Sequence, residues 1–471
     1  MSSQIFLLRS LTICLTLIGL AVVAGAQVAD DAGLYAVRRS DRTAREAGAF
    51  AQLPAAEHMR RANVYMPNRA FTEAREHWQA VIANGASEAN VPAALFGTGR
   101  SYFQEQRYEE ALRFFERVAR EYPQTKDGRE GLNSFAATLL RLGRPTEAAA
   151  RYAEYIERYP DAERIESAHL NVIDSFREAD RTREAMAWIE STRERFTGSA
   201  TDKNALFAEL RLHVAASEWR QAAQTADQLL SRPFQSGVLT TPDEVGYLRG
   251  YSLERSGHTE DAIRSYLALP PGSYYGRLAT EKLSAMTNGT ARSRAMQRAA
   301  DARTQTATTA SLYPALYRES ILRFAKSRAL DPRLVLAVMK EESRFRPRAK
   351  SLSAARGLLQ LTLDTAARYA TRAHVSHLTE NQLYDPDVSI AIGSAYLAQL
   401  SQLFPNLPEA VAASYNGGED NVARWLKRAK QSDPGVFVAE VGFAETKNYV
   451  FKVITSYRAY QQLYTADLKR R

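Results

Sequence analysis

The sequence predicts an all-α fold, in which an N-terminal α-solenoid of helix-pair repeats precedes a second, mostly helical domain. Small alanines recur at a fixed interval between residues 60 and 285, which is typical of stacked helix pairs. Apolar residues in the last third of the chain follow helical spacing, and no convincing run there alternates apolar and polar residues as a half-buried strand would. With 471 residues, 45% of them apolar, the chain is long enough for about three domains. Its composition is unlike that of a collagen, a coiled coil or a disordered protein.

The N-terminus has the pattern of a secretory signal peptide over residues 1–26. Arg9 supplies a positive charge, residues 11–23 form an apolar segment, and residues 24–26 are small, as at a cleavage site before Gln27. The single cysteine, Cys14, lies in the apolar segment. The exported chain would therefore contain no thiol and could form neither a disulfide nor a cysteine metal site. Residues 27–60 follow as a separate N-terminal segment.

The chain is basic, but its charges do not predict a nucleic-acid partner. The formal net charge is +9, and removal of Arg9 lowers it by one. A basic exported protein could bind anionic wall polymers, membrane surfaces or nucleic acid. The arginines, however, alternate with acidic residues along helices, as in residues 113–121, and such a pattern favours a solvated surface. No basic helix with interleaved aromatic residues predicts a nucleic-acid partner, and no segment after residue 26 is apolar enough to predict a transmembrane helix.

The repeats occupy residues 61–285. Alanines that follow a polar or acidic pair stand at Ala74, Ala111, Ala148, Ala185, Ala222 and Ala262. The first four steps each cover 37 residues and the last covers 40. The unit that contains Ala111 also has Gly99, Tyr102, Phe115 and Pro123 at the spacing of a tetratricopeptide repeat. These residues are expected in the core of the array, where small side chains let paired helices approach, and binding is expected on the concave surface.

A linker and a second domain complete the chain. Residues 286–311 are poor in large apolar groups and rich in Ala, Arg, Thr and Ser, which predicts a mobile or loosely helical linker. The second domain is expected over residues 312–471. It begins with helix-spaced Tyr313, Tyr317 and Ile321, and the pair Asp331-Pro332 predicts a helix start. Because this segment has its own apolar periodicity, it is expected to fold alone.

One carboxylate of the second domain falls in an apolar stripe. At about 100° per residue, Leu334, Val335, Val338 and Met339 form one arc of a helix, and Glu342 lies about 80° round from Leu334, near the centre of that arc. Burial of a carboxyl without a charge partner raises its pKa, as a general acid requires near neutral pH. The alternative is a helix-end glutamate that reaches solvent or pairs with Arg344 or Arg346.

Several short blocks surround Glu342 in a fixed order. Residues 342–345 read ESRF, 357–360 read GLLQ, 365–366 read TA, 383–386 read LYDP, 395–397 read AYL, 414–418 read SYNGG, 423–426 read ARWL and 445–450 read ETKNYV. Together they resemble the catalytic domain of the soluble lytic transglycosylases. The string YYGRLA at 274–279 resembles the segment that joins the superhelix of that family to its catalytic domain. The resemblance implies a goose-lysozyme-like, mostly helical catalytic domain with a long saccharide groove.

The resemblance also implies a reaction. Cleavage of the β-1,4 bond between N-acetylmuramic acid and N-acetylglucosamine in peptidoglycan would leave 1,6-anhydro ends, with one glutamate acting first as acid and then as base. Neither a metal nor another cofactor is implied. The enzyme would be periplasmic and associated with the cell wall, its partners would be glycan strands, and the repeats could bind proteins. By match of motifs, Glu342 is the catalytic residue, and the groove residues are Ser351, Gln360, Tyr415, Asn416, Glu445 and Tyr449.

Two other readings stay open at this stage. A hydrolase of the same bond needs a second carboxylate to activate water, and Asp364, Asp385, Asp387, Glu419, Asp420 and Glu440 are all without a comparably buried sequence context. The sequence favours a helix-cap role for Asp385. For Glu445, an ion pair and contact with the sugar are equally compatible with the sequence. A non-catalytic wall-binding scaffold is suggested by Thr362-Leu363, which replaces a methionine-proline pair of the family. Leu359, Ala354 and Gly418-Glu419 are further departures from the family pattern.

Overall fold

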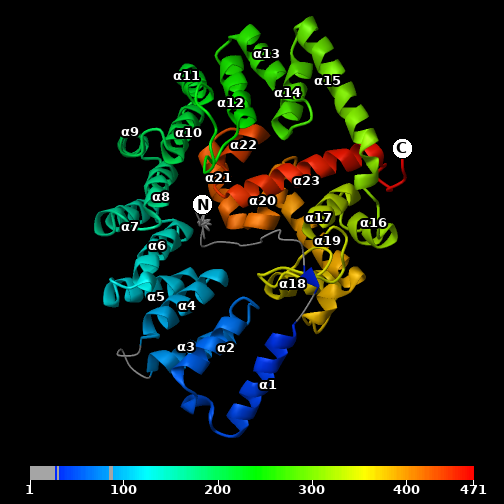
Figure 1. Ribbon diagram of the computed structural model, residues 1–471. Coiled ribbons are helices and arrows are strands. Elements are labelled where there is room, and N and C mark those ends of the chain that lie inside the picture. The colour runs from blue at the N-terminus through cyan, green and yellow to red at the C-terminus, as the bar shows by residue number, and fades with distance from the viewer. Residues whose placement is uncertain (1–26, 29–30, 84–88) are drawn as a thin grey trace, which may run out of the picture.

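The computed structural model describes residues 27–28, 31–83 and 89–471 of the chain, so the predicted signal peptide lies outside the described residues. Nearly all regular structure in these ranges is helical. The exception is a two-stranded antiparallel sheet, in which β1 (Gln27–Val28) pairs with β2 (Ala349–Lys350). Figure 1 shows the first fifteen helices as an arc, with the C-terminal helices on its concave side. The predicted all-α fold is confirmed.

Six consecutive helix pairs build the arc. Their bounds are α2 (Ala55–Tyr65) with α3 (Phe71–Ala83), α4 (Val91–Gln104) with α5 (Tyr108–Glu121), α6 (Lys126–Arg141) with α7 (Pro145–Arg158), α8 (Ile165–Glu178) with α9 (Thr182–Arg195), α10 (Ala200–Ala215) with α11 (Trp219–Leu230), and α12 (Pro242–Arg255) with α13 (Thr259–Ala268). The six repeated alanines each lie on the second helix of a pair and are fully buried. The need for small residues is direct at Gly99, where an added Cβ would lie 2.8 Å from the ring of Phe115.

The predicted linker is a regular helix. After α14 (Tyr274–Ala285), the helix α15 (Gly289–Thr308) runs for 20 residues and is capped by the side chain of Asn288, which accepts a hydrogen bond from the backbone of Ala291 at 3.0 Å. Ala291 and Ala295 are fully buried. Alanine and arginine are strong helix formers, and small alanines are enough to pack this helix against its neighbours. The expectation of a mobile or loosely helical segment is therefore wrong.

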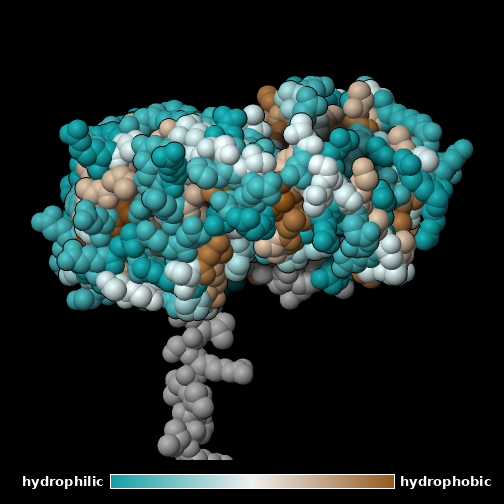
Figure 2. All heavy atoms as spheres, turned by 90° about the horizontal axis from the view of Figure 1, so that it is seen from above, coloured by the Kyte–Doolittle hydropathy of each residue, from teal (hydrophilic) through white to brown (hydrophobic). Residues whose placement is uncertain are grey.

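The C-terminal domain contains eight further α-helices. They are α16 (Arg318–Lys326), α17 (Pro332–Ser343), α18 (Leu363–Ala370), α19 (Pro386–Leu403), α20 (Pro408–Gly417), α21 (Glu419–Ala429), α22 (Pro434–Glu440) and α23 (Ala444–Leu463), with short 3₁₀ turns η2 (Ala310–Leu312), η3 (Thr371–Ala373) and η4 (Asn381–Tyr384). Among the helices that the structure describes, none combines the length and the apolar character that crossing a lipid bilayer requires. In the view of Figure 2 the surface is mostly hydrophilic, with hydrophobic residues in small groups.

The array and the C-terminal domain share a core. Tyr274 and Tyr275 of α14 contact Phe451 of α23, with ring centroids 5.1 and 5.7 Å apart. One hydrophobic cluster runs from α12–α15 into the C-terminal helices, and a second joins α10–α12 to Val436 and Ala439 of α22. The boundary expected at residue 312 therefore falls inside a continuous apolar core.

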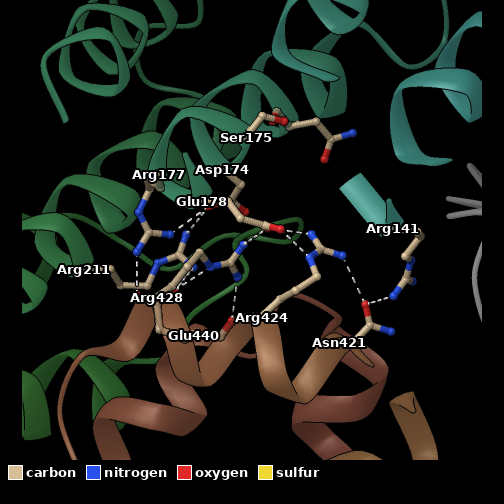
Figure 3. A network of polar contacts seen from close by, with 11 residues as sticks. Arg141, Asp174, Ser175, Arg177, Glu178, Arg211, Asn421, Arg424, Arg428 and Glu440 are labelled. Carbon is tan, nitrogen blue, oxygen red and sulfur yellow. Dashed lines mark hydrogen bonds and ion pairs between the residues drawn. The ribbon is translucent and has the colours of Figure 1, made fainter. Parts of the chain in front are cut away.

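A polar network joins the middle of the array to the same domain (Figure 3). Glu440 of α22 accepts hydrogen bonds from Arg177 of α8 at 2.5 Å and Arg211 of α10 at 3.4 Å, and Arg428 of α21 lies 3.3 Å from it. Burial alone would raise the pKa of Glu440, but the three arginines, Arg177 foremost, hold it below its usual range. The expectation that Glu440 lacks a buried setting is wrong, since only 2% of this residue is exposed.

The start of the arc contacts the domain as well. Helix α1 (Ala32–Glu46) and the 3₁₀ turn η1 (Phe50–Gln52) precede α2 within the segment 27–60. Arg38 of α1 donates to Glu380 at 3.0 Å, and Arg69, between α2 and α3, donates to Asp364 of α18 at 2.6 Å. With the contacts of α14 and α15 with α23 at the other end, both ends of the arc contact the C-terminal helices (Figure 1).

Candidate active site

Helix α17 presents Glu342 at its C-terminal end. The helix starts at the predicted place, since the Asp331 side chain accepts a hydrogen bond from the backbone of Arg333 at 2.9 Å and Pro332 opens the first turn. It ends where Arg344 and Phe345 take positive φ angles of 51° and 62°. The apolar arc that starts at Leu334 is buried, with no member more than 4% exposed. Glu342 therefore lies on the buried face of α17 in its last turn, where it is partly buried.

The carboxyl group of Glu342 has one described hydrogen-bond donor. The phenol of Tyr449 on α23 donates to its Oε1 atom at 2.6 Å. Burial raises the pKa of Glu342 to about 8; the hydrogen bond from Tyr449 opposes this, and the charges of Glu341 and Glu445 add to it. Within the described ranges Glu342 has no ion pair with an arginine such as Arg344 or Arg346. The predicted raised pKa is confirmed.

The neighbouring Glu341 has a different environment. Its Oε1 atom accepts hydrogen bonds from Lys340 at 2.8 Å and from Ser456 of α23 at 2.7 Å. The two adjacent glutamates thus differ in their partners, as expected for residues on two faces of one helix.

Tyr415 reaches the site from α20. Its hydroxyl donates to the backbone carbonyl of Leu359 at 2.6 Å, and its ring stacks on Tyr396 with centroids 5.2 Å apart. Burial, and then the charge of Glu342, raise the pKa of the phenol well above its usual value. Tyr415, Tyr449 and Glu342 therefore lie within electrostatic reach of one another.

The loop over residues 349–361 carries Ser351 and Gln360. The side-chain nitrogen of Gln360 donates to the carbonyls of Ala349 at 3.0 Å and Gly357 at 2.9 Å. The hydroxyl of Ser351 accepts a hydrogen bond from the backbone of Ala355 at 3.0 Å. Both side chains therefore form hydrogen bonds that stabilise the loop itself. The turn forms with Ala354 at φ 58°, so the expected glycine is not required for it.

Two of the predicted groove residues differ in how they are held. The side-chain oxygen of Asn416 accepts a hydrogen bond from Thr446 of α23 at 2.6 Å. Glu445 is partly buried and, in the part of the chain that the structure describes, its Oε1 atom is buried without a hydrogen-bond partner. Burial raises the pKa of Glu445 to about 7 against the charge of Lys452. The ion-pair alternative for Glu445 is not what the described residues form.

Three of the other acidic candidates have partners away from Glu342. Asp364 pairs with Arg69, Asp387 pairs with Arg323 at 2.5 Å, and Asp385 caps α19 by accepting from the backbone of Val388 at 3.0 Å. The cap role predicted for Asp385 is confirmed. Across the described ranges no three His, Cys, Asp or Glu side chains converge in a way that could hold a metal ion.

Sequence reasoning missed the residues that support the loop from outside. Asp31, at the start of α1, accepts hydrogen bonds from Lys350 and Arg356 of the loop. Arg356 is 1% exposed. Residues 31 and 356 are too far apart in sequence for any periodicity to connect them. A buried arginine inside a motif is the one signal that could have prompted a search for a distant partner.

Family models match both halves of the chain. Residues 319–437 match the model described as the transglycosylase SLT domain, and residues 59–125 and 136–162 match tetratricopeptide repeat models. The C-terminal domain is a transglycosylase SLT domain. Glu342, Ser351, Gln360, Tyr415 and Asn416 lie inside the match of the SLT domain. Glu445 and Tyr449 lie shortly after it.

Proteins that contain similar segments are lytic murein transglycosylases. The soluble lytic murein transglycosylase of Escherichia coli (strain K12) is 31% identical over 157 residues, which cover 33% of this chain and 24% of that protein. The same-named protein of Salmonella typhimurium is 31% identical over 150 residues, which cover 31% of this chain and 23% of that protein. The matched part thus spans about a quarter of these curated relatives.

Solved structures are similar over most of the chain, and one of them illustrates the extent of the match. An inactive mutant of lytic transglycosylase Slt from Pseudomonas aeruginosa matches with a TM-score of 0.49 and 18% identity, over 89% of this chain and 74% of that chain.

Proposed function

We propose that the protein is a peptidoglycan lytic transglycosylase. It would cleave the β-1,4 bond between N-acetylmuramic acid and N-acetylglucosamine and leave a 1,6-anhydro-N-acetylmuramic acid end. The observation that carries the proposal is the hydrogen-bonded pair of Glu342, inside the SLT match, and Tyr449, shortly after it. A carboxyl with a pKa of about 8 is protonated at neutral pH, and a 2.6 Å hydrogen bond holds its orientation.

In the first half of the reaction Glu342 is the acid. Its proton moves to the glycosidic oxygen while the bond between that oxygen and C1 of the muramic acid breaks. The leaving sugar departs with a free hydroxyl, and positive charge develops at C1. Glu342 is now a carboxylate, and the hydroxyl of Tyr449 stabilises it by a charge-assisted hydrogen bond.

In the second half Glu342 is the base. The C6 hydroxyl of the same muramic acid attacks C1, and its proton returns to the Glu342 carboxylate. The new bond between C1 and O6 closes the anhydro ring. Proton and bonds balance without water, so the cycle ends with Glu342 protonated as it began. One carboxyl that titrates near neutral pH is sufficient for both halves.

The cell-wall setting is part of the proposal. The signal peptide pattern over residues 1–26 supports export to the periplasm, where peptidoglycan lies. The helical array, which has the SLT domain on its concave side, would present glycan strands to the groove or bind partner proteins on its concave surface. The departures at Thr362-Leu363 fall at the start of α18, where Thr362 caps the helix. They concern saccharide contact, and the proton transfer does not depend on them.

The test of this proposal is the variant Glu342→Gln. It keeps the shape of the side chain and removes the titrating group, so release of muropeptides from purified sacculi should fall at least about a hundredfold. Glu341→Gln is the matched control, because an amide oxygen can still accept the hydrogen bonds from Lys340 and Ser456. Release by the Glu342→Gln variant at close to the wild-type rate would refute the proposal.

The environment of Glu445 is the reason to retain a hydrolase as the second candidate function. Its carboxyl raises the pKa of Glu342 and has a buried oxygen without a described partner, so it is the acidic side chain best placed to activate water. A hydrolase requires that carboxylate, whereas the transglycosylase uses it at most for binding. Under our proposal Glu445→Gln weakens the apparent affinity for glycan but still yields anhydro ends. Loss of all cleavage, together with reducing ends from the wild type, would favour the hydrolase.

A further inference from the structure

The carboxylate at the start of α1 does not cap that helix. Asp31 stands at the N-cap position of α1, where an aspartate normally accepts from the first backbone NH groups, but its side chain makes no capping hydrogen bond. Instead it accepts from Arg356 Nη2 at 2.8 Å, from Lys350 Nζ at 2.6 Å and from the hydroxyl of Tyr384 at 3.1 Å. All three donors belong to the SLT domain.

These contacts hold a buried cation in place. Arg356 is 1% exposed, and Asp31 is 8% exposed. A buried guanidinium without a counter-ion is strongly unfavourable, because it has lost water and gained nothing in return. Burial alone would raise the pKa of Asp31, but Arg356 and Lys350 hold it below its usual range. Asp31 is therefore the counter-ion that allows Arg356 to stay inside the loop.

Arg356 in turn sets the shape of the loop that carries the groove residues. Its backbone pairs with Leu361 in both directions, at 2.9 and 3.1 Å, and its Nη1 donates to the carbonyl of Ala354 at 2.8 Å. The bracing bonds of Ser351 and Gln360 lie within this same loop. β1 also pairs with β2 at the start of the loop. The N-terminal segment thus contacts the loop by side chain and by backbone.

The loop is connected directly to the helix of Glu342. The hydroxyl of Ser343, the residue after Glu342, donates to the carbonyl of Leu358 at 2.7 Å. Tyr415 donates to the next carbonyl, that of Leu359. A shift of the loop would therefore move the groove wall relative to the proton donor, and displacements of about 1 Å can cost about a hundredfold in rate.

We propose that Asp31 is a positioning residue for the saccharide groove: by neutralising buried Arg356, the N-terminal end of the array sets the geometry of residues 349–361 against Glu342. This inference rests on the proposed transglycosylase function for its effect on rate. Its structural part, the dependence of the loop on Asp31, stands independently of that function.

The experiment compares Asp31→Asn, Asp31→Glu and Arg38→Gln in the full chain. Arg38 also lies on α1 and also pairs with the SLT domain, at Glu380, but it does not contact the loop, so Arg38→Gln controls for a weakened α1 contact. Initial rates are measured on soluble, uncross-linked glycan strands. We expect Asp31→Asn to lower kcat at least about tenfold with KM within about threefold. Asp31→Glu should restore most of kcat, and Arg38→Gln should match the wild type.

Hydrogen exchange separates this inference from the proposed function. In Asp31→Asn the backbone amides of residues 349–361 should exchange faster than in the wild type, while those of the array keep their rates. The proposal is overturned if loop exchange and kcat are unchanged, if Asp31→Glu is no better than Asp31→Asn, or if the loss of kcat only follows the unfolded fraction. An inactive wild type whose loop still loosens in Asp31→Asn would leave the coupling intact and refute the transglycosylase alone.

Discussion

At the scale of single residues, helical periodicity placed Glu342 on the apolar arc of α17, and burial then determines the direction of its pKa. Periodicity alone left a helix-end glutamate as an equal alternative, and the ordered motif blocks favoured Glu342. Its partner Tyr449 lies on another helix and could be named only from a separate block, at residues 445–450. Glu440 could not be found either way. Its burial depends on Arg177 and Arg211 of the array, and no local pattern records such a contact.

The raised pKa of Glu342 predicts a stability change in Glu342→Gln. The folded pKa of about 8 exceeds the ordinary value of 4.5, so the folded wild type holds a proton that the unfolded chain has lost. The stabilisation this provides is complete below pH 4.5 and is lost as the pH rises through 8. Relative to its difference from wild type at pH 4, the glutamine variant should gain about 1–3 kcal/mol of unfolding free energy at pH 7. Denaturant titrations at both pH values measure this, and a difference that is the same at both would contradict it.

Tyr449→Phe should change the pH dependence of cleavage. The hydrogen bond from Tyr449 favours the charged form of Glu342, so its loss raises the pKa of Glu342 further. Because the acid must be protonated, the alkaline limb of the kcat profile should move upward by about 1 in pH. Tyr457→Phe is the control, since Tyr457 lies on the same helix but donates to Asp331 at 2.9 Å. An alkaline limb that stays in place in Tyr449→Phe would show that the phenol does not act on this carboxyl.

At the scale of elements, the repeats were predictable and the linker was not. The alanines at regular steps predicted six helix pairs because each unit must bury the same small side chain against its partner. The helix α15 escaped prediction because its buried face is built from Ala291, Ala295 and Ala302. A count of large apolar residues misses a face of this kind, although the composition favours a helix.

The ion network between α8, α10, α21 and α22 should be a main contributor to the docking of the SLT domain on the array. Glu440→Gln leaves three arginines around a neutral group in a buried site, and the free energy of unfolding should fall by about 3–5 kcal/mol. Asp180→Asn is the matched control. Asp180 pairs with Lys430 across the same interface at 2.7 Å, but both side chains are 50% exposed, so the loss should stay below about 1 kcal/mol. Equal losses in urea titrations of the two variants would show that burial of the network is unimportant.

At the scale of the whole molecule, the SLT domain lies on the concave side of the array and shares an apolar core with it. The sequence predicted two domains with a boundary at residue 312 but could not show the contacts between them. Apolar residues of α14 face α23, and the polar network and Asp31 add two further contacts. These contacts join residues that are hundreds of positions apart in the sequence, and no local pattern predicts them.

Because of this shared core, a fragment of residues 312–471 should be less stable alone than a fragment that also contains α12–α15. A cut at 312 removes Tyr274 and Tyr275 from Phe451 and exposes the apolar face of α23. A fragment that begins at residue 242 keeps α12–α15 and should melt cooperatively at a higher temperature than the fragment 312–471. Thermal unfolding of both fragments, followed by circular dichroism, tests this. Equal melting temperatures would show that the domain boundary does lie at residue 312.

Digestion in water enriched in heavy oxygen tests whether Glu342 cleaves the glycan without water. Glycan strands are digested by the full chain in this water, and the masses of the muramic acid ends are measured by mass spectrometry. We expect ends that are lighter by one water than reducing ends and contain no heavy oxygen, and we expect neither product from Glu342→Gln. Reducing ends that carry the label would contradict it, because the oxygen would then come from solvent and not from the C6 hydroxyl.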